Sequence, residues 1–382
     1  MKIVHIAPLA PYNEGWGYQE NLLPKYQKKL GHDVTLVITN RENSSDGIKE
    51  IAPCDYVRED GVRVIRLKIK KYFSRLLTNF NSKLEVYELL KDLAPDFVFF
   101  HGLMSSSIYD VVKYKKLVNK NCIIVCDSHL DDNNYPYKSG YKRTILKILN
   151  RIRYKKVDKY VSKVYGVTPL RVDFVKEFFS VPKEKADLLI MGADDDRINF
   201  DSYETIRSKI REENGVFDEF LVVTGGKLDK AKNVLQLMKA CIQIKGVKLL
   251  IMGSVSEDIK DEFNTLISNN DNLIYVGWVQ SDRVYDYYFA GDLIVFPGGH
   301  SVLWEQACAS KTPCVFNAIK GVQHLNNGGN CAFVDGADVN ALKGIIESLV
   351  FTENYFKMKG VAESSATDKY LYSNIAKKSL EI

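Results

Sequence analysis

Residues 296–313 read F-P-G-G-H-S-V-L-W-E-Q-A-C-A-S-K-T-P and lie between two apolar runs, 293–296 and 314–316. The pattern predicts a strand, a glycine turn, a helix and a second strand. Ser301 is the expected N-cap of the helix, which must stop before Pro313 because proline cannot continue a helix. A strand–helix–strand unit of this kind is typical of an α/β fold with a parallel sheet.

The same turn has the chemistry of an anion site. The backbone N–H groups of Gly298 and Gly299 are expected to point outward, where the helix dipole adds positive charge, so they would suit a phosphate. Glu305, one helical turn further on, is a carboxylate that can accept hydrogen bonds from the vicinal hydroxyls of a sugar. Together these groups predict a nucleotide-sugar site. The simpler interpretation is an ordinary turn followed by a solvated glutamate.

Length and composition narrow the class of protein. A chain of 382 residues is too long for one core, so two domains are expected. No apolar run reaches the roughly 18 residues of a membrane span, and residues 2–8, K-I-V-H-I-A-P, predict a first strand rather than a signal peptide. The seven cysteines lack the spacing of a disulfide framework and indicate reduced thiols in a cytoplasmic protein.

Charge is unevenly distributed along the chain. Residues 1–200 hold 34 Lys and Arg against 25 Asp and Glu, whereas residues 201–382 hold 19 against 23. The excess is densest at 138–163, where ten basic residues and several tyrosines accompany a single acid, Asp158. A basic, tyrosine-rich helix suits an anionic membrane surface or a nucleic acid. No nucleic-acid-binding module is recognisable, so we expect the membrane, with a merely solvated helix face as the alternative.

Apolar runs alternate with helical patterns along the chain. Helices are expected, for example, at 18–30, 82–93, 107–118, 203–214 and 234–244. Strands that alternate with helices indicate parallel sheets covered on both faces, which is a doubly wound α/β fold. The expected strands are 3–6, 34–38, 62–67, 97–100, 123–125, 164–167 and 188–191, and then 220–223, 248–252, 273–276, 293–296, 314–316 and 331–334.

Ligands of such sheets bind at the carboxyl ends of the strands. Four residues of the first half fall there: Gly15 and Gly17 follow the first strand, His101 follows 97–100, and His129 comes shortly after 123–125. The glycines lack the dinucleotide-binding spacing, so they are expected to let the backbone approach a bulky ligand. A histidine beyond an apolar strand is commonly structural, but two at one edge favour a functional pair.

In the second half, the strand 220–223 opens into G-G-K-L-D-K-A-K-N, residues 225–233. Gly226 lies in this strand-to-helix loop. Lys227 and Lys232 bracket the loop, from where both ammonium groups can reach a diphosphate. We therefore expect a first domain at 1–198 and a second, anion-binding domain at 199–364, facing each other across a cleft. A C-terminal helix at 365–382 is expected to return to the first domain.

Taken in order, these motifs resemble those of the GT-B glycosyltransferases, and of glycosyltransferase family four in particular, over nearly the whole chain. In the first domain the likeness rests on the Gly15/Gly17 loop with L-G-H-D-V-T-L-V after it, on D-F-V-F-F-H-G-L around His101, on I-V-C-D-S-H-L around His129, and on L-L-I-M-G-A-D-D-D-R-I-N-F. In the second it rests on G-K-L-D-K-A-K-N, on G-W-V-Q-S-D-R-V-Y-D-Y-Y-F-A-G-D-L-I-V-F-P at 277–297, and on E-Q-A-C-A-S-K-T-P-C-V. Lys227 stands where the family has arginine.

The resemblance implies a retaining transferase that moves a sugar from a UDP- or GDP-linked donor to a glycan or lipid-linked glycan acceptor, as in the synthesis of surface polysaccharides. It implies no metal and no other cofactor. It further implies His101 near the sugar at the reacting centre, Lys227 and Lys232 on the diphosphate, and Glu305 on the ribose of the nucleotide.

The resemblance also implies a different role for each domain. The second would bind the donor, with Ser301 and Val302 belonging to the phosphate-cradling turn at 298–302. The first would bind the acceptor, near His129, at the cytoplasmic face of the cell membrane. From its basic, tyrosine-rich composition, we expect the segment 135–163 of this domain to rest peripherally on lipid there. Its apolar and basic side chains would meet headgroups: Ile145, Leu146, Ile148, Leu149 and Ile152, and Lys142, Arg143, Arg151 and Arg153.

One departure from the family bears on function. The family pairs two glutamates separated by seven residues, the second of which is Glu305, but Pro297 stands in place of the first. His300 is the nearest candidate for the vacant catalytic role. The alternatives are therefore an inactive donor-binding partner subunit and a nucleotide-sugar 2-epimerase of the same fold. A GT-A transferase with Asp194 and Asp196 on a metal is disfavoured, because that fold has no second doubly wound domain.

Overall fold

The computed structural model describes residues 1–44, 47–71, 82–135 and 137–382. Within these ranges the chain divides into two compact units, Met1–Ile190 with Ile375–Ile382, and Met191–Asn374. Each unit has its own largely parallel sheet and its own core of buried aliphatic and aromatic side chains. The predicted doubly wound α/β fold is confirmed in both.

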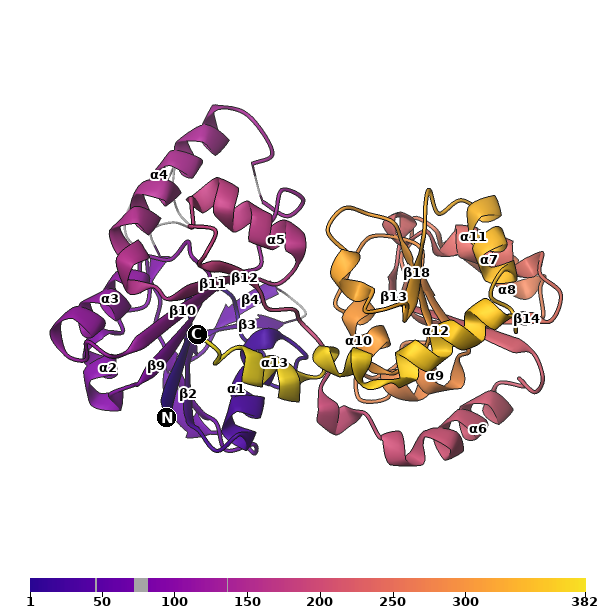
Figure 1. Cartoon of the computed structure of the whole chain (residues 1–382), viewed down its shortest axis with the longest axis horizontal. Helices are drawn as coiled ribbons and strands as arrows, with labels where there is room; N and C mark the ends of the chain where they lie inside the picture. The colour runs from indigo at the N-terminus through magenta and orange to yellow at the C-terminus, as the bar shows by residue number, and fades with distance from the viewer. Residues whose placement is uncertain (45–46, 72–81, 136) are drawn as a thin grey trace. The chain divides into compact units, whose positions relative to one another are not determined.

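The sheet of the first unit has the order β12-β11-β10-β9-β1-β2-β6-β5, and every neighbouring pair is parallel except β5 with β6 (Figure 1). Its central strands are buried over nearly their whole length because helices cover both faces, and such strands are largely apolar. The strands are β1 Lys2–Ala7, β2 Asp33–Thr39, β5 Cys54–Val57, β6 Arg63–Leu67, β9 Phe97–His101, β10 Ile123–Ser128, β11 Lys163–Gly166 and β12 Ala186–Leu188.

The C-terminal segment from Ile375 belongs to the first unit, where the side-chain amide of Gln27 donates a hydrogen bond to Ser379 Oγ at 2.9 Å. In Figure 1 the yellow helix α13 lies beside α1. None of the helices in the described ranges is long and apolar enough to cross a bilayer. The helices are α1 Gln19–Lys29, α2 Tyr87–Leu93, α3 Ile108–Leu117, α4 Tyr141–Val157, α5 Pro169–Phe174 and α13 Tyr372–Lys378.

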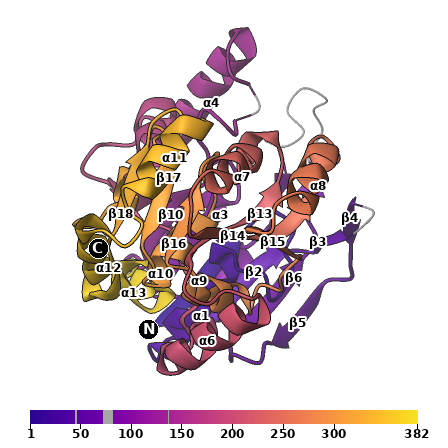
Figure 2. The ribbon, with the colours of Figure 1, turned by 90° about the vertical axis from the view of Figure 1, so that its right-hand side faces the viewer.

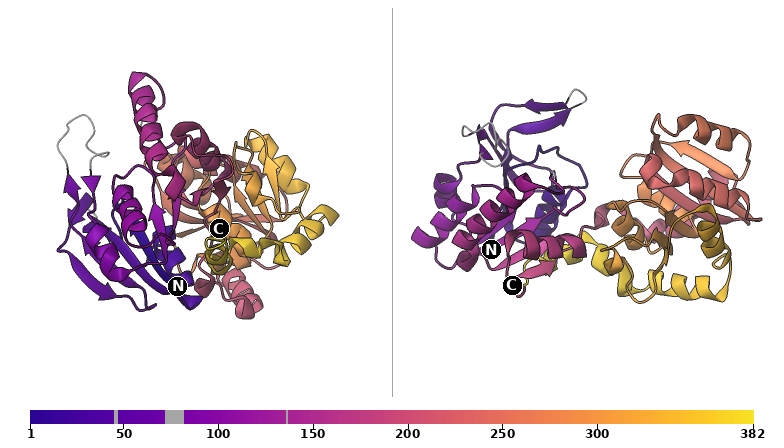
Figure 3. Two further views of the ribbon diagram at one scale, coloured as in Figure 1. Left: turned by 60° about the vertical axis from the view of Figure 1, so that its left-hand side comes forward. Right: turned by 90° about the horizontal axis from the view of Figure 1, so that it is seen from above.

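Two short antiparallel pairs lie outside the main sheet. One joins β3 Arg41–Ser44 to β4 Gly47–Glu50, and the other joins β7 Lys70–Lys71 to β8 Ser82–Lys83. The β3–β4 pair projects from the first unit (Figure 3, right). Sequence analysis missed it because its strands have no buried face, so they lack the alternation of apolar and polar residues that marks a half-buried strand.

The sheet of the second unit is parallel throughout and has the order β15-β14-β13-β16-β17-β18. Numbered in chain order this is 3-2-1-4-5-6, the order of dinucleotide-binding sheets, which reverses between β13 and β16. Helices α7, α8 and α11 lie over one face (Figure 2). The strands are β13 Phe220–Leu228, β14 Val247–Val255, β15 Leu273–Gly277, β16 Leu293–Phe296, β17 Cys314–Asn317 and β18 Cys331–Val334.

A buried ion-pair cluster fastens the helix α6 to this sheet. Arg207 and Arg211 on α6 contact the carboxylate of Asp292, and Arg211 Nη1 lies 3.1 Å from Asp292 Oδ2. The same carboxylate accepts the backbone N–H of Leu221 on β13 at 2.7 Å. The helices of this unit are α6 Tyr203–Glu213, α7 Val234–Ile242, α8 Lys260–Ser268, α9 Val284–Ala290, α10 Leu303–Ala309, α11 Val339–Glu347 and α12 Glu353–Glu363.

Several predicted boundaries are wrong. The helix expected at 82–93 begins only at Tyr87. The side chains of Ser107 and Asp110 accept the backbone N–H groups of Leu84 and Val86, respectively, so the residues before Tyr87 do not join the helix. The helix expected to begin at Ser301 begins at Leu303, and its N-cap is Val302, without a side-chain hydrogen bond. The strand expected at 188–191 is β12, which ends at Leu188.

The chain passes into the second unit after Ile190, rather than after residue 198 as predicted from the sequence. The reason is a backbone bridge between Ala193 and Leu371. Ala193 donates its N–H to Tyr370 O at 2.8 Å and accepts the N–H of Tyr372 at 3.0 Å. These bonds tie residues from 191 onward to the second unit.

Candidate functional site

A cavity opens where the second sheet reverses its strand order, the place at which doubly wound sheets bind ligands. Its volume is about 140 Å³, and the end of β13 and the turn after β16 line it. The predicted residues that line it are Gly226, Lys227, Lys232, Gly298, Gly299 and Ser301. Val302, His300 and Glu305 do not line this cavity, so the structure brings together most, but not all, of the predicted donor-binding residues.

The two lysines of the cavity differ in their surroundings. Lys232 is half-buried and donates from Nζ to the backbone oxygen of Gly299 at 2.7 Å. Burial lowers the pKa of this ammonium group, and nearby Asp229 offsets only part of the effect. Lys227 has a side chain 73% exposed, with Nζ 3.9 Å from Asp229 Oδ2. The cavity thus has one cation fixed to its wall and a second that reaches solvent.

The glycines of the two loops serve different purposes. A Cβ on Gly298 would lie 2.3 Å from Lys232 Cα, so only glycine lets the turn after β16 pack against the loop after β13. A Cβ on Gly299 would meet nothing within 4 Å. The N–H of Gly299, however, donates to Ala231 O at 3.1 Å. The expectation that this N–H points outward to a phosphate is therefore wrong, because loop packing occupies it.

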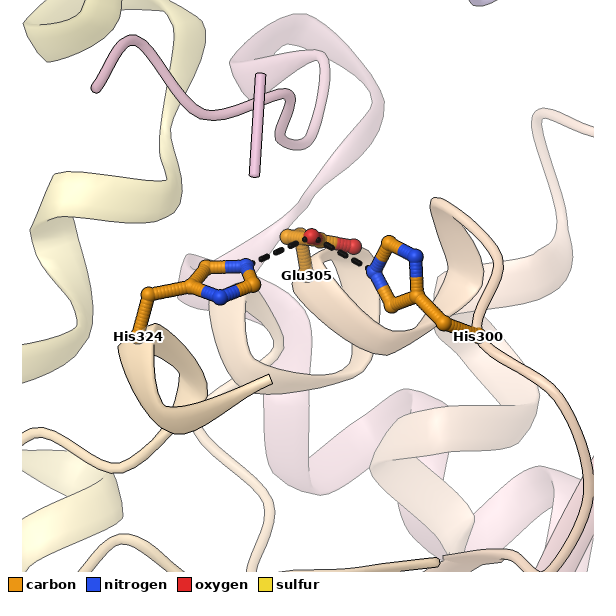
Figure 4. A group of neighbouring side chains, drawn as sticks. All are labelled: His300, Glu305 and His324. Carbon is orange, nitrogen blue, oxygen red and sulfur yellow. Dashed lines mark hydrogen bonds and ion pairs between the residues drawn. The ribbon is translucent and has the colours of Figure 1, made fainter. Parts of the chain in front are cut away.

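Glu305 lies in a buried cluster with two histidines (Figure 4). Its side chain is fully buried, and its Oε1 atom accepts from His300 Nε2 at 2.9 Å and from His324 Nε2 at 3.0 Å. Its second oxygen, Oε2, has no hydrogen-bond partner in the described part of the chain. The simpler interpretation of Glu305 as a solvated helix residue is wrong. His324 escaped sequence analysis because no motif places it near Glu305.

The histidines keep Glu305 ionised. Burial by itself would raise the pKa of this carboxyl group, but the hydrogen bonds and charges of His300 and His324 lower it to about 2. A buried carboxylate with one unpaired oxygen is an acceptor that a ligand hydroxyl would satisfy. His300, whose side chain is 15% exposed, is the more accessible of the two imidazoles.

Among the residues that the structure describes, these three side chains form the group that could hold a metal ion, since their ligand atoms all lie within 4.8 Å of one another. The hydrogen bonds indicate that the imidazole nitrogens facing Glu305 carry protons and do not ligate a metal. Each Nε2 that donates a proton to Glu305 has no lone pair for a cation. A metal-bound imidazole usually donates its other N–H to a partner, whereas His324 Nδ1 is buried without one in the described chain. The residues therefore fit a hydrogen-bonded cluster better than a metal centre.

In the first unit, His101 is part of a second buried cluster at the carboxyl end of β9. Its Nδ1 lies 2.7 Å from Asp127 Oδ2, and its Nε2 lies 3.0 Å from His5 Nδ1. Asp127 also accepts the backbone N–H of Gly102 at 3.0 Å. Sequence analysis missed both partners, although each is a polar residue within an apolar strand, and that pattern could have drawn attention to them.

His129 shares the Asp127 carboxylate, with its Nε2 atom 3.6 Å from Oδ2. Burial lowers the pKa of His129, but the carboxylate more than offsets this, so the net pKa lies above its ordinary value. Burial likewise would raise the pKa of Asp127, but His101 and His129 hold it far below its usual range. The predicted pairing of His101 with His129 at one sheet edge is therefore present, with Asp127 between them.

The remaining predicted residues lie in loops. Gly15 and Gly17 are in the loop between β1 and α1, where Gly15 has a φ of +79°, a left-handed conformation that favours glycine. Asp194, offered as a metal ligand in the GT-A alternative, is buried and pairs with Arg197 Nε at 3.3 Å. That ion pair, together with the second doubly wound unit, removes the GT-A alternative.

Comparison with known proteins agrees with this geometry. Residues 219–350 match the model of the family described as glycosyl transferases group 1. A glycosyltransferase from Rickettsia africae superposes with a TM-score of 0.69 at 17% identity, covering 100% of this chain and 97% of the other. The chain has the GT-B fold. The family match lies within the second unit and covers the cavity and Glu305.

Two further structures share this GT-B fold across the whole chain. Sucrose-phosphate synthase from Thermosynechococcus elongatus has a TM-score of 0.65 at 17% identity, covering 99% of this chain and 97% of the other. The Anabaena protein HepE, solved in complex with UDP, has a TM-score of 0.66 at 14% identity, covering 100% and 99%. No curated protein sequence matches the chain.

Proposed function

We propose that this GT-B protein transfers a sugar from a nucleotide-sugar donor to a glycan or lipid-linked glycan, with retention and without a metal. The observation that carries the proposal is the cavity at the β13/β16 switch point, where Lys232 and Lys227 supply two cations for a diphosphate. Charge-assisted bonds of this kind are the strong ones in diphosphate recognition. The group 1 family match covers the same residues.

Glu305 supplies the second part of a donor site. We propose that its unpaired oxygen accepts the ribose hydroxyls, and that His300, which contacts the other oxygen, takes the place of the absent first glutamate near the sugar. Gly226, Gly298 and Ser301, which line the cavity, would surround the phosphates. HepE was solved with UDP, which favours a uridine diphosphate donor over the guanosine one. The resemblance to family four supports retention.

Donor identity and activity can be tested together. A thermal-shift screen of UDP, GDP, ADP and their sugars should give one preferred base, because a ligand at a hundredfold its dissociation constant stabilises by about 2.7 kcal/mol. The preferred nucleotide sugar is then incubated with glycan acceptors, and NMR follows the anomeric configuration of the product. Retained configuration supports the proposal. Inversion at C2 of the sugar would instead indicate the 2-epimerase, and binding without turnover would indicate a donor-binding partner subunit.

We further propose that α4 attaches the first unit to an anionic membrane. The helix has seven basic residues and no acid. Tyr141, Ile145, Ile148, Leu149 and Ile152 are between 43 and 72% exposed, and their spacing puts them on one face of the helix. The helix projects from the first unit (Figures 1 and 2). An apolar face flanked by lysines and arginines suits lipid headgroups.

The contacts of α4 correct the sequence expectation in two respects. Leu146 is buried, so it belongs to the core and not to the lipid-facing set. Arg143 pairs with Asp132, and Arg151 and Arg153 donate to the backbone oxygens of Glu177 and Met104. Arginines held in this way are poor test positions. Exposed basic residues such as Lys142, Lys155 and Lys156 are better placed to meet lipid phosphates.

Vesicle sedimentation tests the attachment. Wild type should bind vesicles that contain anionic lipid and release them at high salt, since each lysine near such a surface contributes about 1 kcal/mol. Replacing Ile145, Ile148 and Leu149 by Ser should abolish binding. The matched control replaces Leu117 and Val118, which are exposed on and next to α3, and should leave binding intact. Absence of binding at low salt would refute the attachment and favour a soluble acceptor.

A further inference from the structure

A chain of buried hydrogen bonds leads from the C-terminal segment to the carboxyl edge of the first sheet. It passes from Ser379 through Gln27 on α1 and His5 on β1 to His101 on β9, and ends at Asp127 on β10. All five side chains are at least 95% buried, because the most exposed of them, His101, shows only 5% of its surface. Because bulk water does not reach these side chains, their hydrogen-bond partners determine which atoms carry protons.

The first link fixes the orientation of the Gln27 amide. The hydroxyl of Ser379 has one proton, and its Oγ lies 2.6 Å from the backbone oxygen of Ala376. Two oxygen atoms so close need the proton between them. Ser379 Oγ must therefore accept from Gln27, whose NH₂ group lies 2.9 Å away. This leaves Gln27 Oε1, which can only accept, facing His5 Nε2 at 2.7 Å.

The second link fixes the proton of His5. Its Nε2 must donate to Gln27 Oε1, so a neutral His5 has its lone pair on Nδ1. Complete burial, with His101 nearby, lowers the pKa of His5 to about 3, which keeps the ring neutral. Arg58 adds to this effect, whereas Gln27 and Asp127 oppose it. His5 Nδ1 therefore accepts a hydrogen bond from His101 Nε2 at 3.0 Å.

The third link completes the assignment. His101 Nδ1 faces Oδ2 of an ionised Asp127, which has no proton to give, so this nitrogen also carries hydrogen. We infer that His101 is held as an imidazolium ion, with both ring nitrogens protonated, and that Ser379, Gln27 and His5 are positioning residues that maintain this state. The other groups that act on the cluster are His129, which faces the same carboxylate, and Glu20 and Arg171, which act on His129.

This assignment deepens the proposed function, on which its catalytic meaning rests. A doubly protonated His101 has no lone pair, so it cannot take the acceptor proton. It provides a positive charge at the carboxyl edge of the first sheet, on β9 between β1 and β10, where it would stabilise negative charge that develops on a bound substrate. The C-terminal segment, far away in sequence, would thereby set the charge of a residue predicted to lie at the reacting centre.

The protonation itself can be measured without substrate, so its test stands apart from that of the transfer activity. Protein labelled with ¹⁵N at its six histidines gives nitrogen shifts that distinguish a neutral ring from an imidazolium. A His101→Gln spectrum identifies the signals of His101. Both of its nitrogens should be protonated at pH 7. A single protonated nitrogen on His101 at pH 7 would overturn the inference.

Three variants test the positioning residues by the same spectrum. Ser379→Ala frees the Gln27 amide to turn, so His101 should have only one protonated nitrogen at pH 7, whereas Ser373→Ala on the preceding helix α13 should change nothing. His5→Leu removes the acceptor and should have the effect of Ser379→Ala. His5→Asn places an amide oxygen near the lost Nδ1 and should restore the doubly protonated ring. If Ser379→Ala does not fold, the wild-type spectrum and the two His5 variants still decide the matter.

Discussion

Five of the six histidines of the chain lie in two buried clusters, each built around one carboxylate. Asp127 is flanked by His101 and His129 in the first unit, with His5 behind His101. Glu305 is flanked by His300 and His324 in the second. In both clusters the imidazoles lower the pKa of a carboxyl group that burial alone would raise. At the residue scale the chain thus keeps two anions deep in low-dielectric surroundings, which costs stability unless both are paired.

The first residue-scale prediction concerns Lys232. Replacing it by alanine should weaken nucleoside diphosphate binding at least about tenfold, because a charge-assisted hydrogen bond is worth about 1.5–3 kcal/mol. Lys230→Ala is the control, since this lysine is exposed on the same loop and does not line the cavity. Calorimetric titration with UDP and GDP measures the effect. Equal affinities for the two variants would remove Lys232 from the diphosphate site.

The second concerns the acid dependence that Glu305 confers. Its pKa is depressed from the ordinary 4.5 to about 2, so the ionised group stabilises the fold fully above the ordinary value. This stabilisation is lost as pH falls toward 2. The difference in thermal midpoint between wild type and Glu305→Gln should therefore be largest near neutral pH and shrink as pH is lowered. A difference that stays constant from pH 7 to about 3 would contradict the assigned ionisation.

At the scale of elements, α6 and α4 are held by different forces. Helix α6 has a single buried residue, Ile210, and is fastened by Arg207 and Arg211 to Asp292. Helix α4 buries Leu146, Asn150, Tyr154 and Val157 and leaves an apolar face in solvent. An element that the core does not cover on its apolar side is a candidate for binding a surface, and this is the basis for the membrane proposal.

The element-scale prediction tests the α6 anchor. Asp292→Ala would leave two arginines largely buried and unpaired, which should cost about 3 kcal/mol and lower the thermal midpoint of the second unit by roughly 6–12 °C. Asp286→Ala breaks a partly exposed pair between α9 and Arg283, the residue just before that helix, and should cost less than about 1 kcal/mol. Calorimetry compares the two variants. Similar midpoints would mean that apolar packing, not the ion pair, holds α6.

At the scale of the whole molecule, the two units have different candidate functional residues at equivalent positions of their sheets. Both have a ligand edge where the strand order reverses, between β1 and β9 in the first unit and between β13 and β16 in the second. The second carries the lysines and the open cavity, and the first carries the His101 cluster. The proposed transfer assigns donor binding to this edge of the second unit.

The molecule-scale prediction concerns metals. Because His300 and His324 donate protons to Glu305, we expect transfer activity to survive exhaustive chelation and to show no dependence on added zinc or magnesium. The thermal midpoint should likewise be unaffected by a chelator. Activity lost on chelation and restored by one divalent ion would show that the cluster exchanges its protons for a metal.

The sequence by itself determined the fold class and most strands, because buried parallel strands are continuous apolar runs and the helices between them have a clear period. It also placed Lys227, Lys232, Gly298 and Gly299 at one edge, since strand-to-helix loops of a parallel sheet meet at that edge. Local chemistry sufficed for these features, because each depends on residues close together in the chain.

Only the tertiary structure decided what the buried charges contact. His5, His101 and Asp127 come from three strands, and Ser379 comes from the far end of the chain, so no local pattern joins them. Glu305 and His324 are likewise brought together by packing alone. The protonation of such groups depends on which donors and acceptors surround them when water is excluded. These neighbours are known only from the folded structure. The sequence therefore identified three of the histidines as candidate site residues but could not show which of their nitrogens carry protons.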